Sequence, residues 1–195
     1  MRTADVQVID DLGLDIEGLR RSALEADYQL VSVDVPGVDY DAELMAPAPN
    51  KLSRQVIMAA GSRLNKHVRM VSSAYRLCEA ATGDGWRIAG GGPKGVHLAD
   101  HVAVLNLNAR SGPYKEDGTG LALWRHDPSG EVSGDAASPL ERFSSRSWSM
   151  CGLIPLVAGR VVLLPVEAYV SFWPMSPPGT GFDAGRLMWA AYVDG

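Results

Sequence analysis

The last third of the chain constrains the fold most, because short apolar runs alternate there with turns rich in proline and glycine. Val161 to Leu164 and Leu187 to Val193 are apolar runs, and they are separated by Pro165 and by the long segment Pro174 to Gly185. Runs of this length between turn signals are typical of buried strands. An earlier run, Val102 to Asn108, has the same character. We therefore expect these strands to pack together around one cavity.

The first third of the chain shows helical spacing instead. Ile16 to Asp27 is a predicted helix that Asp15 can cap, and Lys51 to Ala60 is a second helix that Gly61 is placed to end. The prolines of the segment 39–50 predict a surface loop before the second helix. Further extended segments are predicted at 6–9, 28–35, 67–73, 74–80, 121–126 and 169–173.

Helices followed by many strands with long loops predict an α+β fold whose β part is a sandwich or barrel. The 195 residues are enough for one domain with a buried core. We expect residues 1–66 to form a mostly helical part of that single domain and residues 67–195 to form its β part.

Composition excludes several classes of partner. A net charge of -5 and the absence of a lysine and arginine cluster exclude nucleic-acid binding, which needs a basic face. No apolar run approaches the ~20 residues that span a bilayer. Acidic residues stand where a signal peptide would have its apolar core, so we expect a cytoplasmic protein.

Cys78 and Cys151 are expected to be small buried residues in a reducing compartment. The predicted partner is a small-molecule substrate, and a homodimer stays open because the sequence does not set the oligomeric state.

Familiar catalytic signatures are missing from the chain. The triple glycine at 90–92 lacks the spacing of a phosphate-binding loop and is predicted to be a turn. No nucleophile elbow of the GxSxG type and no Cys–His signature is present. His97 and His101 are four residues apart, which is a metal-binding spacing only on a helix, and their surroundings read as extended.

An ordered set of short motifs covers almost the whole chain. The set begins with Asp10-Asp11-Leu12, Asp15 to Arg20, Ala23-Leu24 and Val35-Pro36-Gly37, continues with Val96-His97, Val102 to Asn108 and Gly118-Thr119 through Arg125-His126 and Gly130, and ends with Gly159 to Leu163 and Gly185-Arg186-Leu187.

This order resembles a bacterial branch of the 2-oxoglutarate/Fe(II)-dependent oxygenase superfamily. The resemblance implies a double-stranded β-helix, also called a jelly roll or cupin-like fold, with flanking N-terminal helices. It also implies a role in natural-product biosynthesis. Enzymes of this kind hold Fe(II) with two histidines and one carboxylate, which leaves positions open for 2-oxoglutarate and oxygen.

The resemblance maps these iron ligands onto altered positions. His97 matches the first histidine, but the carboxylate expected two residues later is replaced by Ala99, and Asp100 is one residue late. On a strand a shift of one residue turns a side chain to the other face unless a bulge corrects it. Val170 stands where the second histidine is expected, and Glu167 is the nearest substitute.

The resemblance maps the 2-oxoglutarate site with similar changes. Arg186 matches the arginine that pairs with the far carboxylate of 2-oxoglutarate. Its companion hydroxyl residue is replaced by Met188, and Asn106 stands where a tyrosine is common. A surface salt bridge at a strand start is an equally good interpretation of Arg186.

Acid–base chemistry stays open without a metal. The titratable residues that we expect at the cavity are His97, Asp100, His126, Glu167 and Tyr169. The residues that we expect to bind substrate or an anion there are Asn106, Arg125, Trp148, Trp173 and Arg186.

Three hypotheses follow. The first is an enzyme that keeps the oxygenase pocket without cofactor and performs a cyclisation, isomerisation or elimination. The second is a true Fe(II) and 2-oxoglutarate oxygenase whose ligands are His97, Asp100 and Glu167. The third is a non-catalytic protein that binds a small molecule. The first is favoured, because loss of the second histidine removes a ligand without an evident replacement.

Overall fold

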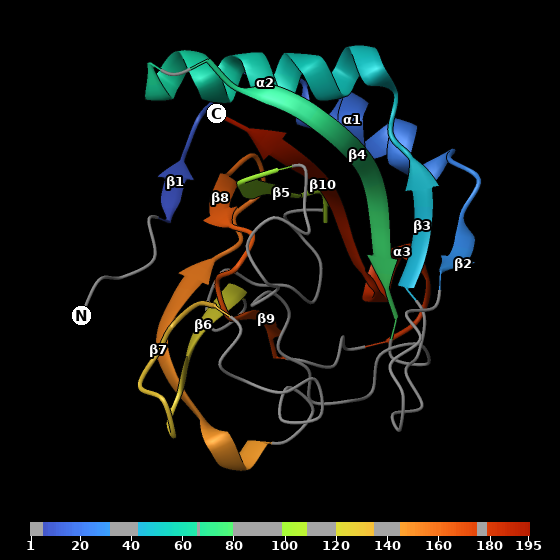
Figure 1. The fold of residues 1–195 in the computed structure, drawn as a ribbon. Helices are drawn as coiled ribbons and strands as arrows, with labels where there is room; N and C mark the ends of the chain where they lie inside the picture. Colours follow the sequence, from blue (N-terminus) through green and yellow to red (C-terminus); the bar gives the residue numbers. More distant parts are fainter. Residues whose placement is uncertain are drawn as a thin grey trace.

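A computed structural model of the chain describes residues 6–31, 43–65, 67–79, 99–108, 120–134, 145–174 and 179–195. Its strands form two antiparallel sheets, one of seven strands in the order β1-β8-β5-β10-β4-β3-β2 and one of three in the order β7-β6-β9 (Figure 1). The strands of the larger sheet are β1 (Gln7–Ile9), β2 (Gln29–Val31), β3 (Glu43–Pro47), β4 (Arg69–Cys78), β5 (His101–Asn106), β8 (Val161–Pro165) and β10 (Arg186–Asp194). Those of the smaller sheet are β6 (Gly120–His126), β7 (Trp148–Pro155) and β9 (Val170–Trp173).

Two helices cover the outer face of the larger sheet, α1 (Ile16–Leu24) and α2 (Asn50–Leu64) (Figure 1). The predicted cap of α1 is confirmed, because the Asp15 carboxylate accepts a hydrogen bond of 2.8 Å from the backbone N–H of Gly18. A side chain at Gly18 would clash with that carboxylate, so glycine lets the cap close over the first turn. The short helices η2 (Ser145–Ser147) and α3 (Gly181–Ala184) precede β7 and β10.

The main core lies between these helices and the sheet. Alternate residues of β10, such as Leu187 and Trp189, point to the helices and are fully buried with Val56 of α2. The indole N–H of Trp189 donates to the hydroxyl of Ser53 over 3.0 Å, and the hydroxyl of Ser73 donates to the same oxygen over 2.9 Å. Ser53 therefore joins α2 to both central strands, β10 and β4.

Three local predictions were wrong. The second helix does not end at Gly61 but continues to Leu64, because Asn65 adopts the left-handed conformation that closes it. Part of the predicted loop 39–50 is the strand β3, which pairs with β4 and ends at Pro47. Proline has no backbone N–H to donate, and at the end of the strand this does not interrupt the pairing. The two strands predicted at 67–80 are the single strand β4.

No helix in the described part of the chain is long and apolar enough to cross a membrane. The two cysteines both lie in that part and form no disulfide.

Candidate functional site

The two sheets enclose a second, inward-facing set of side chains. Side chains of a strand alternate between faces, so the residues of β10 next to the helix-facing ones point toward the smaller sheet. Met188, Val104 and Leu164 of the larger sheet pack there against Leu121 of the smaller sheet. Val170 and Phe172 of β9 pack against the same cluster. We call the face of the larger sheet that carries these residues the inward face.

Arg186 is the buried cation of the inward face. It is 4% exposed and begins β10, directly opposite Cys78 of β4. Its guanidinium donates a hydrogen bond of 2.7 Å to the carbonyl of Pro174 and lies 4.7 Å from the centre of the Phe172 ring. Arg186 is therefore not the exposed residue that a surface salt bridge requires, and its guanidinium lies against the smaller sheet.

Two asparagines fix the strand end that carries Arg186. The Asn106 side chain donates to the carbonyl of Leu156 over 2.8 Å and accepts from the backbone N–H of Asn108 over 3.1 Å. The Asn108 side chain donates to the carbonyl of Gly185 and accepts from the N–H of Leu187. Asn106 thus faces the predicted cavity, but both of its side-chain polar atoms have protein partners, which gives it a positioning role.

Two of the three predicted metal ligands lie in the described part, and their backbones are close, because Val166, the neighbour of Glu167, donates to the carbonyl of Asp100. His97 lies outside the described residues. Asp100 is exposed and precedes β5, where its backbone N–H donates to Val193 and its carbonyl accepts from Val166, each over 3.0 Å. Glu167 lies half-buried in the turn between β8 and β9. Within the described part, no group of three His, Cys, Asp or Glu side chains could hold a metal ion.

The other positions implied for cofactor binding carry apolar side chains. Val170 belongs to the inward cluster, so it points where a ligand would have to point, but it has no donor atom. Ala99 is 6% exposed and likewise has none. Met188 is buried directly opposite Asn106 on the inward face. At these described positions the side chains do not fit Fe(II).

A second group of predicted site residues lies on the opposite face of the smaller sheet. Trp148 and Tyr169 meet edge to face with ring centroids 4.8 Å apart, and both are buried with Trp124. Trp173 packs against this cluster. Leu121 points inward, and its neighbour Ala122 packs with these aromatic residues on the other side of the smaller sheet. The aromatic residues therefore do not line the space around Arg186. The expectation that all predicted site residues share one cavity is wrong for this group.

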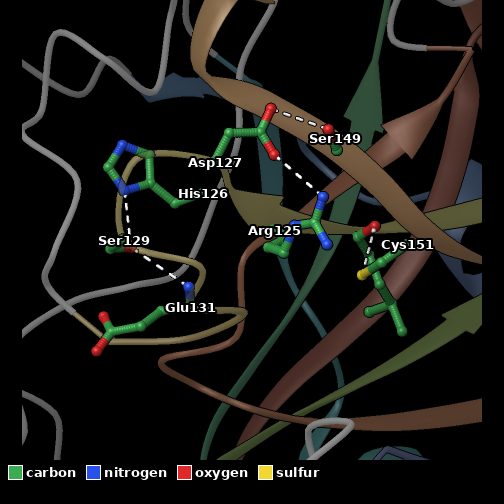
Figure 2. A network of polar contacts seen from close by, with 8 residues as sticks. Arg125, His126, Asp127, Ser129, Glu131, Ser149 and Cys151 are labelled. Carbon is green, nitrogen blue, oxygen red and sulfur yellow. Dashed lines mark hydrogen bonds and ion pairs between the residues drawn. The ribbon is translucent and has the colours of Figure 1, made fainter. Parts of the chain in front are cut away.

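His126 belongs to the same outer face and lies at the end of β6 (Figure 2). It is 3% exposed, its ring is tilted against the Trp148 ring with centroids 5.0 Å apart, and its Nδ1 lies 2.9 Å from the hydroxyl of Ser129. The backbone N–H of Glu131 donates to that same hydroxyl (Figure 2). The group closes the turn 127–130, so His126 has a packing role here.

Arg125 takes part in a surface network. It contacts Asp127 over 3.4 Å, and Asp127 accepts a hydrogen bond of 2.9 Å from Ser149 (Figure 2). The Arg125 and Asp127 side chains are 41% and 39% exposed. Nearby, the Cys151 thiol donates to the carbonyl of Leu123, and burial raises its pKa.

Sequence reasoning missed three inward or supporting residues as parts of a site: Arg76, Cys78 and Asn108. Arg76 and Cys78 were missed because the two short strands predicted there left the register of β4 against β10 undefined. The strand pattern of 69–78 could have placed Arg76 and Cys78 on one face, but only pairing with Met188 and Arg186 shows which face it is.

Comparison with known proteins identifies the fold. No family model matches the sequence, and no curated protein matches it. Among solved structures, HygX from Streptomyces hygroscopicus with nickel and 2-oxoglutarate bound is 15% identical with a TM-score of 0.55, over 98% of this chain and 83% of HygX. The epimerase SnoN and the carbocyclase SnoK, both non-heme alpha-ketoglutarate-dependent enzymes of nogalamycin biosynthesis, are each 12% identical with a TM-score of 0.56. They match 98% of this chain and 78% and 80% of their own lengths.

The chain therefore has the α+β jelly-roll fold of the 2-oxoglutarate/Fe(II)-dependent oxygenase-like enzymes, as the motif order predicted.

Proposed function

We propose that this protein is a small-molecule enzyme of natural-product biosynthesis that keeps the oxygenase fold, has lost the metal site and catalyses a non-oxidative step. The candidate reactions are cyclisation, isomerisation and elimination, and each is redox-neutral. Two similar structures, SnoN and SnoK, are an epimerase and a carbocyclase by description, which supports a role in rearranging a small molecule on this fold.

The observation that carries the proposal is Val170. Its side chain packs in the inward cluster beside Phe172, so the position is oriented for a ligand and filled by a group that cannot bind a metal. Shifting the alignment by one residue cannot place a histidine at this position, because the sequence contains no histidine after His126.

A second observation weakens the iron-dependent alternative with His97, Asp100 and Glu167 as ligands. Asp100 pairs with Val193, seven positions along β10 from Arg186. At ~3.3 Å per residue this is a separation of about 23 Å between backbones. One five-carbon co-substrate is too short to connect a metal at Asp100 with Arg186.

The residues that remain for catalysis are few. A shaped apolar space needs only one acid or base to promote a redox-neutral rearrangement, provided that it holds the substrate in a reactive conformation. Arg186 would bind and orient the substrate, and His97 stays our prediction for the proton-transfer group. His126 and Tyr169 are not needed for this chemistry, since they pack on the far side of the smaller sheet.

The deciding experiment is metal analysis with Fe(II) and 2-oxoglutarate titration under anaerobic conditions. Protein purified without chelator should contain little iron and should show no visible absorption band of an iron–2-oxoglutarate chelate. HygX prepared in parallel is the positive control, since its crystal structures contain iron, nickel and 2-oxoglutarate. Near-stoichiometric iron together with the band would refute the proposal.

A further inference from the structure

The smaller sheet ends in a long strand edge that no described strand covers. The edge strands of the two sheets in the described part of the chain are β1, β2, β9 and β7. The first three contain three, three and four residues, whereas β7 contains eight and lies at the periphery of the molecule (Figure 1). An edge strand presents unpaired backbone N–H and C=O groups, and proteins commonly keep their edge strands short for this reason. Three edges of this fold are short, and the edge of β7 is not.

The side chains of β7 also lack the usual protection of an edge. No charged residue occurs between Trp148 and Leu156, although charged side chains are a common means of keeping strand edges apart. Met150 and Leu153 are 38% and 36% exposed, and Cys151 between them is exposed as well. An exposed apolar edge of this length is typical of a surface that pairs with another strand.

A β-bulge turns the two exposed apolar side chains to the same face. Met150 stands opposite Trp124 of β6, and Leu153 stands opposite Ala122. Those two β6 residues pack in one cluster, and directly opposite residues of a strand pair point to the same face. Met150 and Leu153 therefore share a face, because the bulge at Cys151 adds one residue between them.

We propose that β7 pairs antiparallel with β7 of a second copy of this chain, around a two-fold axis at the bond between Cys151 and Gly152. Met150 and Leu153 are equidistant from that bond, so each Met150 meets Leu153 of the partner subunit. A bulge usually keeps an edge strand from pairing, but here both copies carry it at the axis, so the two strands keep the same length and register. The pairing joins two three-stranded sheets into one and uses the free edge of β7 in both copies, so it closes as a dimer.

The expected dimer is weak. An interface built on one eight-residue edge is smaller than the ~1,200–2,000 Å² of stable complexes, so the expected dissociation constant is about 1–100 µM. Sedimentation velocity of the full-length protein between about 1 and 300 µM covers this range. The measurement is independent of the proposed function, since neither metal content nor catalysis enters it.

Charged substitutions on β7 separate this interface from any other. Met150→Lys and Leu153→Glu should each weaken the dimer about tenfold or more, because a charge then loses water against an apolar side chain. An equimolar mixture of the two variants should dimerise again, since the lysine of one chain then meets the glutamate of the other. This rescue requires folded chains and the antiparallel register. Leu30→Lys, on the exposed three-residue edge β2, is the matched control and should dimerise like the wild type.

Cross-linking tests the same axis without charged substitutions. A short bis-maleimide should join two wild-type chains through Cys151, should join them equally in Cys78→Ser, and should join none in Cys151→Ser. Wild-type protein that stays monomeric up to about 300 µM would overturn the proposal. So would a dimer that Met150→Lys leaves intact, a mixture of folded charge variants that stays monomeric, or a cross-link that survives Cys151→Ser, because each result places the contact elsewhere or removes it.

Discussion

Ser53 gives the sharpest test of how the helices are held on the larger sheet. Its hydroxyl is fully buried and accepts hydrogen bonds from the Trp189 indole over 3.0 Å and from the Ser73 hydroxyl over 2.9 Å. Ser53→Ala removes the shared acceptor and changes the volume by one oxygen only. The indole N–H of Trp189 then remains in a fully buried position without a partner.

The cost can be worked out donor by donor. A buried donor without a partner costs about 1–3 kcal/mol. Trp189 is 0% exposed and should incur about 2 kcal/mol of that range. Ser73 is half-buried and can turn its hydroxyl toward water, so it should add no more than about 0.5 kcal/mol. The sum of ~2–2.5 kcal/mol corresponds to a fall in melting temperature of about 4–10 °C for a domain of this size.

Urea unfolding followed by circular dichroism measures this directly, since a pure stability change shifts the midpoint and leaves the slope unchanged. Ser62→Ala is the matched control, because Ser62 is exposed on the same helix. Trp189→Phe in the Ser53→Ala background should cost less than Trp189→Phe alone, as the two residues share one hydrogen bond. A loss below about 0.5 kcal/mol for Ser53→Ala, or strict additivity of the two changes, would contradict the reasoning.

Two further predictions concern a surface ion pair and a crowded glycine. The Arg160 guanidinium donates hydrogen bonds of 2.6 and 3.0 Å to the Asp10 carboxylate and so holds the pKa of Asp10 below its ordinary value. The ion pair therefore stabilises the fold fully at a pH above the ordinary carboxyl pKa. This stabilisation is lost as the pH falls through the lowered pKa of Asp10. Asp10→Asn should cost about 0.5 kcal/mol at pH 7 and nothing near pH 2, and a pH-independent loss measured by urea unfolding would argue against the ion pair. Gly120→Ala should destabilise by about 1–3 kcal/mol because the added methyl would collide with the backbone of Ile154. Gly152→Ala, which meets only ordinary contacts, should cost clearly less in the same assay.

The sequence predicted those elements whose pattern is local. The Asp15 cap and the β5 and β10 runs follow from short-range signals, and the structure confirms them. The second helix was cut short because a glycine is usually a better terminator than an asparagine, yet Gly61 is buried and Asn65 closes the helix. Local patterns cannot show which neighbours a strand will have.

The candidate site depended on that missing information. Arg186 was assigned to the site through the resemblance of the Gly185-Arg186-Leu187 motif. Arg76 was not, since only the register between β4 and β10 places it beside Arg186. The aromatic residues near His126 were wrongly assigned to the cavity. The alternation of side chains along a strand shows that the strand has two sides, but it does not show which side points toward the other sheet.

Apolar side chains occupy described inward positions that the resemblance assigns to cofactor binding. Ligand side chains that converge without a metal leave polar or charged groups poorly paired in a partly buried space, and such groups are costly. Val170 and Met188 avoid that cost by adding apolar contacts to the cluster between the sheets. The buried polar side chains of this face include Arg186, which contacts the Pro174 carbonyl and the Phe172 ring, and Asn106, which donates to the carbonyl of Leu156. Because both polar side chains are bound by groups of the chain itself, the inward face keeps them buried while the described positions 170 and 188 hold apolar side chains.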